Sequence, residues 1–418
     1  MNICWILNIA DLNMKAVYLP WLHMHQPMVF GENDELISNL EKMFASDDSK
    51  DEWDARLMAR AYRNPAYWAK NLAIEGKHQK IAVDFSGVLL ESLSALSGLL
   101  QEDADGNSIG DIISLWKEVL REFPDSVEFA GTAYAHCYFP VTPEADWKLQ
   151  IDLWRKVASS LFGVGLTERV KGFWLPEMGI PPPEKLGRLV RLLKERGYEW
   201  LILPAEAVRG QKNLSYEKQV EIWTQPHILS IDGGNITVIF RPKYNFIDQQ
   251  GGCDANGIYQ KCIQASKIHG YAEGKSPALI VPASDGENGN IMMNRFFSDT
   301  FIPFAREKLD DKVSSMTITQ FLKDYPPSDE IELEASGSSW LGGHSHWETG
   351  DERLEMKRKI EQLSDKFHSW QKKALKEDAV KALLMAETSC YVYWNSSFWF
   401  DQGKRMIDFA YEKLRKDD

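Results

Sequence analysis

Short apolar runs, rich in β-branched and aromatic residues, alternate along the chain with amphipathic stretches. The runs cover residues 16–24, 81–87, 127–135, 170–178, 199–207, 236–242 and 278–286. Runs of this length and composition predict buried strands. The intervening stretches have helical spacing, as in PEKLGRLVRLLKERG at residues 183–197, which ends in a basic turn and a glycine. The alternation therefore favours an α/β fold with a parallel sheet.

Two details refine this prediction. The segment DGGN precedes residues 236–242 and is typical of a hairpin, so residues 228–242 are expected to be locally antiparallel. Seven near-regular strand–helix units favour a TIM-like barrel over an open sheet, although periodicity alone does not settle whether the barrel closes.

The pattern changes after about residue 310. Residues 352–394 have the spacing of two long helices, and a further helical stretch follows at residues 404–416. We therefore expect a catalytic barrel at residues 14–310 and a helical C-terminal subdomain at residues 311–418. The first β-like run starts only after Met14, so residues 1–13 are expected to be an N-terminal extension outside the barrel.

Composition and charge narrow the classes of partner. The chain has 418 residues and a formal net charge of −13, with no basic stripe, so neither a nucleic acid nor an anionic membrane surface is expected as a partner. We find no apolar run of the roughly 18 residues that a spanning helix needs. The five cysteines lack C-x-x-C spacing, which favours a reducing, cytoplasmic location over a disulfide framework. Fifteen tryptophans fit a large core, and flat indoles also suit stacking on sugar rings.

Polar clusters close four of the apolar runs. They are HMHQP at residues 23–27, AHCYFP at 135–140, Glu177 within WLPEM, and SDGENGN at 284–290. All carboxyl ends of strands in a parallel barrel lie on one face, where catalytic residues concentrate. Two acids on that face, Glu177 and Asp285, are suited to divide nucleophile and acid/base roles at an acetal.

These motifs resemble the signature regions of glycoside hydrolase family 57. HMHQP, WLPEM and SDGENGN resemble three regions, GTAYAHCYFP resembles the second, and SSWLGGHSHW with AETSCYVYW resembles the fifth. The resemblance spans almost the whole chain, from His23 to Trp399. It implies an incomplete (β/α)7 barrel with a helical C-terminal subdomain. It also implies a retaining double-displacement mechanism on carbohydrate substrates, usually α-glucans, with no metal or other cofactor.

The resemblance also assigns roles to individual residues. Glu177 matches the nucleophile and Asp285 the acid/base. His23 and His25 match sugar-contacting histidines, and His136 matches a histidine of the branching-enzyme type. The second and fifth regions differ from those of characterised members, so the resemblance favours a reaction type over any one substrate.

Further residues are candidates for substrate binding. Gln26 adjoins the histidine pair, and His344 and His346 either share the barrel mouth or cap a loop. Four tryptophans are either core residues or sugar platforms: Trp174, Trp340, Trp347 and Trp394. Of these, Trp340 and Trp347 lie in a Gly/Ser-rich loop with little apolar company, which favours exposure and stacking on substrate. Glu287 is interpreted as supporting the acid, and Glu387 and Asp401 as structural.

Two other functions fit parts of the pattern. A metal-dependent polysaccharide deacetylase or mannosidase-like enzyme on a similar barrel would use His23 and His25 as zinc ligands. His344 with His346, or Asp285, would complete such a site, because a catalytic zinc needs only three protein ligands. A catalytically inactive glucan-binding protein would keep the tryptophans, but the presence of both acids argues against it. The sequence leaves open whether water or a second sugar accepts the glycosyl group, and it leaves the oligomeric state open.

Overall fold

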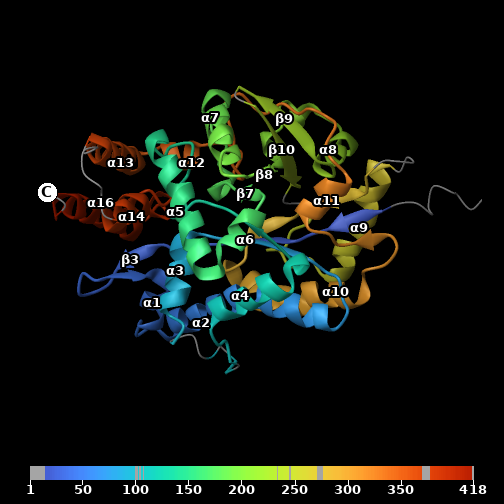
Figure 1. The fold of residues 1–418 in the computed structure, drawn as a ribbon, viewed down its shortest axis with the longest axis horizontal. Coiled ribbons are helices and arrows are strands. Elements are labelled where there is room, and N and C mark those ends of the chain that lie inside the picture. The colour runs from blue at the N-terminus through green and yellow to red at the C-terminus, as the bar shows by residue number, and fades with distance from the viewer. Residues whose placement is uncertain are drawn as a thin grey trace, which may run out of the picture.

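The computed structural model describes residues 15–98, 102, 105–106, 108–232, 234–243, 246–270, 276–369 and 377–416 (Figure 1). The predicted extension at residues 1–13 lies outside these residues.

Seven parallel strand segments run in a continuous order through the centre of the molecule. In one sheet, β2 lies between β12 and β5, and β6 follows β5. In a second sheet, β7, β8 and β10 are parallel, and the bridge between Gly131 and Phe173 joins it to the first. The bounds are β2 (Trp21–Met24), β5 (Ile81–Phe85), β6 (Val127–Ala130), β7 (Gly172–Trp174), β8 (Trp200–Pro204), β10 (Gly234–Arg241) and β12 (Ala283–Asp285). Every predicted run thus contains a strand.

The remaining strands complete this arrangement. β1 (Ala16–Tyr18) and β11 (Ala278–Ile280) precede β2 and β12 in the chain and also pair in parallel. β9 (His227–Ile231) pairs antiparallel with β10, which confirms the predicted hairpin. β3 (Met28–Phe30) and β4 (Leu36–Ser38) form a separate hairpin.

No strand pairing among the described residues joins β10 to β11 or β12. The Arg241 Nε–H instead donates to the Ala283 carbonyl at 2.8 Å. The structure is thus an α/β fold built on parallel sheets, and strand pairing within the described residues does not close them into a ring.

Helices surround the strands on the outside (Figure 1). They are α1 (Asn39–Phe44), α2 (Ser49–Ile74), α3 (Gly87–Ala95), α4 (Ile112–Glu122), α5 (Glu144–Phe162), α6 (Val164–Arg169), α7 (Pro183–Lys194), α8 (Tyr216–Trp223), α9 (Ala255–His269), a π-helix (Ile291–Phe301), α10 (Ile302–Glu307) and α11 (Ile318–Asp324). In α7, the predicted helical pattern buries Leu186, Leu189, Val190 and Leu193 on one side, as its spacing requires.

The core has two layers. Side chains that point to the inside of the curved sheet form one cluster, which includes Val17, Trp21, Trp174, Trp200 and Ile239. These residues come from strands all round the sheet, which explains why the strands read as continuous apolar runs buried on both faces. A larger cluster fills the space between the strands and the surrounding helices.

The C-terminal part of the chain that the structure describes is helical. It contains α12 (Ser345–Glu348), α13 (Asp351–Ser369), α14 (Glu377–Ala386), α15 (Cys390–Tyr393) and α16 (Ser397–Lys416). α13, α14 and α16 lie at the end of the molecule opposite α9 (Figure 1). Before them, β13 (Val313–Ser314) pairs with β1, so residues just past 310 still join the strands. The division of the chain at residue 310 stays a prediction.

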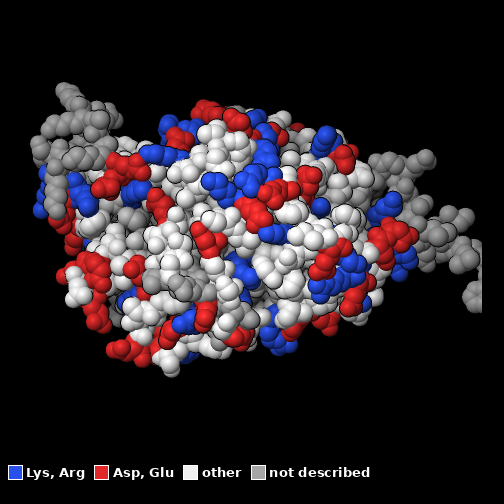
Figure 2. Space-filling view, turned by 60° about the horizontal axis from the view of Figure 1, so that its bottom comes forward, with Lys and Arg blue, Asp and Glu red and all other residues white. Residues whose placement is uncertain are grey.

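Acidic and basic side chains are interspersed over the face of the molecule shown in Figure 2. Within the described residues, no helix is both long enough and apolar enough to cross a bilayer.

Candidate active site

A cavity of about 200 Å³ lies at the carboxyl ends of the strands. It is lined by His23, His25, Gln26, Pro27, Asn39, Met58, His136, Glu177, Asp285, Glu287, Asn288, Trp340, Cys390, Tyr393, Trp394 and Trp399. All four polar clusters that close the predicted strand runs contribute to this wall. The expectation that they share one face is therefore confirmed.

Glu177 is held at the end of β7 by a strained turn. Leu175 and Pro176 follow the strand, and Glu177 then adopts left-handed backbone with φ of 58° and ψ of 13°. Such backbone costs a non-glycine residue on the order of 1–3 kcal/mol, and it persists only where the surroundings impose it. Glu177 is 4% exposed. Its Oε1 accepts a hydrogen bond of 2.6 Å from the Ser389 hydroxyl, whereas Oε2 has no hydrogen-bond partner among the described residues.

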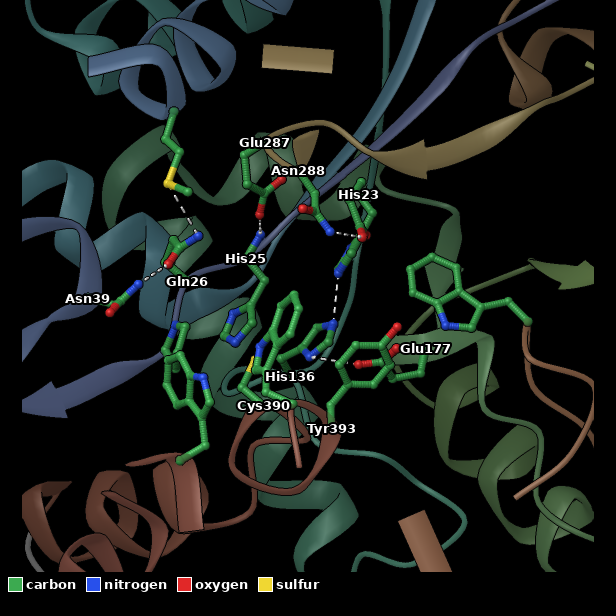
Figure 3. Close-up of a pocket in the computed structure, with 16 residues that line it drawn as sticks. His23, His25, Gln26, Asn39, His136, Glu177, Glu287, Asn288, Cys390 and Tyr393 are labelled. Atoms are coloured by element: carbon green, nitrogen blue, oxygen red, sulfur yellow. Dashed lines mark hydrogen bonds and ion pairs between the residues drawn. The ribbon is translucent and has the colours of Figure 1, made fainter. Parts of the chain in front are cut away.

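A chain of hydrogen bonds leads from Glu177 back into the barrel. Ser389 Oγ lies 3.0 Å from His136 Nδ1, and His136 Nε2 lies 2.8 Å from His23 Nε2. His23 Nδ1 in turn lies 2.7 Å from Asp84 Oδ2, and Asp84 Oδ1 accepts a bond of 2.7 Å from the Trp21 indole. Figure 3 shows His23, His136 and Glu177 following one another along one side of the cavity.

The pKa shifts of the two histidines indicate where the protons lie along this hydrogen-bond chain. Burial disfavours the imidazolium of His23, but the ion pair with Asp84 outweighs burial and raises the pKa of His23 to about 9. Burial and the neighbouring His25 and His23 lower the pKa of His136 well below its usual value, so His136 is neutral. A protonated His23 donates to Asp84 and to His136. His136 then donates from Nδ1 to Ser389, whose hydroxyl donates to Glu177.

The two acids of the SDGEN turn form the opposite wall. Asp285 ends β12, and its Oδ2 lies 3.4 Å from the Asn288 amide nitrogen. Glu287 Oε1 accepts the backbone N–H of His25 at 2.6 Å, and its Oε2 is unpartnered among the described residues. Gly286 between them lies against β2, where a Cβ would come within 2.3 Å of the Met24 Cε.

Burial raises the pKa of all three carboxyl groups. The pKa of Glu177 rises to about 7 through burial and the nearby Asp285, against the opposing bond from Ser389. The pKa of Glu287 rises to about 8 through burial and Asp285, and that of Asp285 is also raised by burial. Three acids with raised pKa values around one cavity are typical of a site that moves protons near neutral pH.

The other sequence-predicted residues divide between the cavity and the core. His25 and Gln26 line the cavity; His25 Nδ1 lies 2.7 Å from the Ser86 hydroxyl, and Gln26 accepts from Asn39 at 2.8 Å. Trp340 and Trp394 line the cavity, and Trp394 is 49% exposed. Glu287, interpreted from sequence as a supporting group, lines the cavity itself.

Trp174 is fully buried and does not line the cavity. Its ring stacks on His23 with the two centroids 4.9 Å apart. Trp174 is thus a core residue that holds His23 in place.

The expectation for Trp347 is wrong. This tryptophan is 1% exposed and stacks on Tyr138, with ring centroids 4.0 Å apart. A Gly/Ser-rich loop has little apolar company of its own, but here it folds onto side chains that are distant in the sequence. Trp347 is therefore absent from the cavity wall.

His344 and His346 fix the same loop and do not line the cavity. His344 Nδ1 lies 2.6 Å from the Tyr138 hydroxyl, and His346 Nε2 lies 2.8 Å from the Tyr393 carbonyl. Of the two interpretations open for them, the structure therefore supports the loop cap. Glu387 is buried and accepts from Gln150, and Asp401 is exposed on α16.

Several site residues were not found by sequence reasoning. They are Asp84, Asn39, Asn288, Ser389, Cys390, Tyr393 and Trp399. Asp84 did leave a signal, because an acid inside the apolar run IAVDF is costly unless it is paired. Ser389 left none, because a serine within a helical stretch is ordinary.

One group of potential metal ligands occurs among the described residues. The nearest donor atoms of His25, His136 and Cys390 lie within 4.8 Å of one another. However, the two imidazoles stack with centroids 4.3 Å apart and planes 9° apart, so their in-plane lone pairs do not converge on one point. Both nitrogens of His136 also belong to the hydrogen-bond chain. The zinc set of His23 and His25 with His344 and His346 is not assembled, because the last two lie outside the cavity. His23, His25 and Asp285 all line the cavity, but they do not form a ligand group among the described residues.

Comparison with models of known protein families shows which family the chain belongs to. The sequence model of glycosyl hydrolase family 57 matches residues 19–334. The chain therefore belongs to glycosyl hydrolase family 57. A search of curated protein sequences finds no match.

Solved structures share the fold at low sequence identity. A 4-α-glucanotransferase from Thermococcus litoralis superposes with a TM-score of 0.66 and 16% identity, covering 96% of this chain and 60% of that one. The present chain thus spans less than two thirds of that relative. A branching enzyme from Pyrococcus horikoshii gives a TM-score of 0.65 and 16% identity, with coverages of 94% and 87%. An α-amylase from Thermotoga maritima gives 0.63 and 13%, with coverages of 96% and 93%.

Proposed function

We propose that this protein is a retaining glycoside hydrolase or glycosyl-transferring enzyme that acts on α-glucan-type oligosaccharides or polysaccharides. Glu177 is the nucleophile and Asp285 the acid/base. The observation that carries the proposal is that both carboxyl groups line one cavity at the carboxyl ends of strands in a family 57 fold.

The environments of the two acids support this division of roles. Burial and the nearby Asp285 raise the pKa of Glu177 to about 7, but the Ser389 hydroxyl bond and the cationic His23 oppose this shift, so that a carboxylate is available near neutral pH. Asp285 has a pKa raised by burial, which favours the protonated form that a general acid needs. Glu177 Oε2 attacks the anomeric carbon while Asp285 protonates the leaving oxygen. Asp285 then deprotonates the water or sugar hydroxyl that releases the glycosyl ester.

Two kinds of observation support an α-glucan as the substrate. The solved relatives include a 4-α-glucanotransferase, branching enzymes and an α-amylase. In addition, Trp340 and the half-exposed Trp394 offer flat apolar surfaces beside the acids. Such surfaces fit the C–H faces of a sugar.

The test is incubation with a panel of oligosaccharides and polysaccharides of different linkage, with the products resolved by size. We expect cleavage of α-linked glucans. Products longer than the substrate identify glycosyl transfer, and shorter products alone identify hydrolysis.

Glu177→Gln should abolish turnover in a folded protein. Asp285→Asn should also slow turnover, but less so for substrates whose leaving group needs no proton. Activity confined to β-linked or acetylated substrates, or an active Glu177→Gln variant, would overturn the proposal.

A further inference from the structure

Ser389 connects the C-terminal helices to the carboxylate at the end of β7. It lies 212 residues after Glu177 in the chain and is 2% exposed, between α14 and α15. Its hydroxyl donates to Glu177 Oε1 at 2.6 Å. A mobile surface serine does not hold a bond of this length, so the position of Ser389 must itself be fixed.

Backbone contacts fix Ser389 from both sides. Its N–H donates to the His136 carbonyl at 3.0 Å, and the N–H of Tyr393 donates back to the Ser389 carbonyl at 2.9 Å. An antiparallel bridge joins the preceding Thr388 to Cys137. The turn before α15 is therefore tied to the loop after β6 by its main chain.

The hydrogen-bond chain fixes which way the Ser389 hydroxyl points. Asp84 holds a proton on His23 Nδ1, His23 donates from Nε2 to His136, and His136 then carries its proton on Nδ1, facing Ser389. A hydroxyl that accepts from His136 has its own proton free to donate. In this structure it donates to Glu177.

The backbone is strained at both residues to which the Ser389 hydroxyl is hydrogen-bonded. His136 has φ of 57° and Glu177 has φ of 58°, and neither residue is a glycine. Each left-handed residue of this kind is costly, and such residues cluster where geometry is imposed for function. Here they aim the imidazole and the carboxylate at the same hydroxyl.

We propose that Ser389 is the positioning residue of the nucleophile, and that the chain from Asp84 through His23 and His136 orients its hydroxyl. The hydrogen bond from Ser389 occupies Oε1 of Glu177 and leaves Oε2 as the attacking oxygen. This role rests on the proposed function, in which Glu177 is the nucleophile. It makes the C-terminal helical part of the chain a component of the catalytic site as well as a wall of the cavity.

The role has a pH signature. A donor to a carboxylate favours the ionised form, so loss of the hydroxyl raises the pKa of Glu177. The other groups that face Glu177 are Asp285 from β12, His23 from β2, His136 and Tyr138 from the loop after β6, Cys390 and Tyr393 from α15, and the Trp340 indole. These groups stay in place when only the Ser389 hydroxyl is removed.

The test measures nucleophilic attack alone. The probe is 5-fluoro-α-D-glucosyl fluoride, with which a carboxylate forms a bond to C1 as the C1–F bond breaks and fluoride leaves without needing a proton. The labelling rate is followed between pH 5 and pH 9, and peptide mass spectrometry locates the label. In Ser389→Ala we expect labelling at pH 6 to fall about 10- to 100-fold, the scale for a hydrogen bond to a charged group. The acidic limb of the pH profile of the labelling rate should move to higher pH. Ser389→Thr, which keeps the hydroxyl, should restore the limb.

Two further variants complete the design. Ser364→Ala removes an equally buried serine from α13 that is not part of the hydrogen-bond chain. It should leave the pH profile of labelling unchanged. Asp84→Asn acts at the far end of the chain without touching Glu177, and should move the acidic limb in the same direction as Ser389→Ala. Thermal melting confirms that each variant is folded.

The outcomes separate the two proposals. Absence of labelling in the unmodified protein, or a label on a residue other than Glu177, overturns the proposed function and the positioning role with it. A label on Glu177 with the same acidic limb in Ser389→Ala as in the unmodified protein overturns the positioning role alone. If Ser389→Ala does not fold, an unchanged limb in Asp84→Asn is sufficient to overturn it.

Discussion

At the scale of single residues, the buried state of Glu177 makes stability depend on pH. Its pKa is about 7 in the folded protein, against an ordinary value of 4.5. Between these values the unfolded chain is ionised while the folded protein still binds a proton. The contribution of Glu177 to stability therefore falls as pH rises from about 4.5 to 7, and it levels off above pH 7.

The substitution Glu177→Gln removes this pH-dependent loss of stability, because an amide does not ionise. We expect the variant to match the unmodified protein at pH 4.5 and to be more stable at pH 8, by on the order of 3 kcal/mol for a shift of this size. Thermal melting of both proteins across this pH range checks the prediction. Melting curves that stay parallel from pH 4.5 to 8 would show that Glu177 is not held protonated by burial.

Two tryptophans with different surroundings should respond differently to replacement by alanine. Trp347 is 1% exposed and Trp394 is 49% exposed at the cavity wall. Trp347→Ala should cost about 3–5 kcal/mol of stability, the scale for emptying a buried aromatic site. Trp394→Ala should raise KM and leave the melting temperature nearly unchanged. Denaturant unfolding and steady-state kinetics of both variants are the measurements, and a reversed pattern would contradict the assignment of the two residues.

At the scale of elements, the loop before α12 fixes the turn that carries Glu177. Ser338 forms an antiparallel bridge with Ile180, and the Trp340 N–H donates to the Glu177 carbonyl at 3.2 Å. Gly337 has φ of 73°, and a Cβ there would lie 2.1 Å from the Ile180 carbonyl oxygen. The close approach of the loop to this turn therefore depends on a glycine.

Gly337→Ala should destabilise the protein and lower kcat, because the new methyl group pushes the loop away from the Glu177 turn. Gly342→Ala is the matched control. It lies in the same loop with φ of 85°, but nothing lies within 4 Å of its added Cβ. The control should cost only the backbone strain, on the order of 1–2 kcal/mol, and keep the activity. Equal effects of the two substitutions on kcat would show that the loop does not hold Glu177 in position for the proposed reaction.

At the scale of the whole molecule, the two carboxylates should suffice for catalysis. His136, a member of the one candidate ligand group among the described residues, already has both ring nitrogens in hydrogen bonds. Dialysis against a strong chelator should therefore leave the proposed activity on glucans intact. A proportional loss of activity that zinc restores would favour the metal-dependent alternative. A parallel assay after dialysis without chelator controls for dilution and ageing.

The sequence by itself determined the strands, the order of the units and the face on which the candidate site residues lie. Each apolar run became a strand because a parallel strand covered on both sides has to be apolar throughout. His23, His136, Glu177 and Asp285 share one cavity because the carboxyl ends of parallel strands lie on one face. These are local or topological consequences, and one chain is enough to infer them.

Only the tertiary structure decided which side chains meet across long separations. Ser389 reaches Glu177 over 212 residues, and Trp347 is buried against Tyr138 although its own loop is polar. Neither contact follows from periodicity, because burial and hydrogen bonding depend on which distant element packs against a segment. The protonation of His23 likewise arises from its pairing with Asp84 on the adjacent strand.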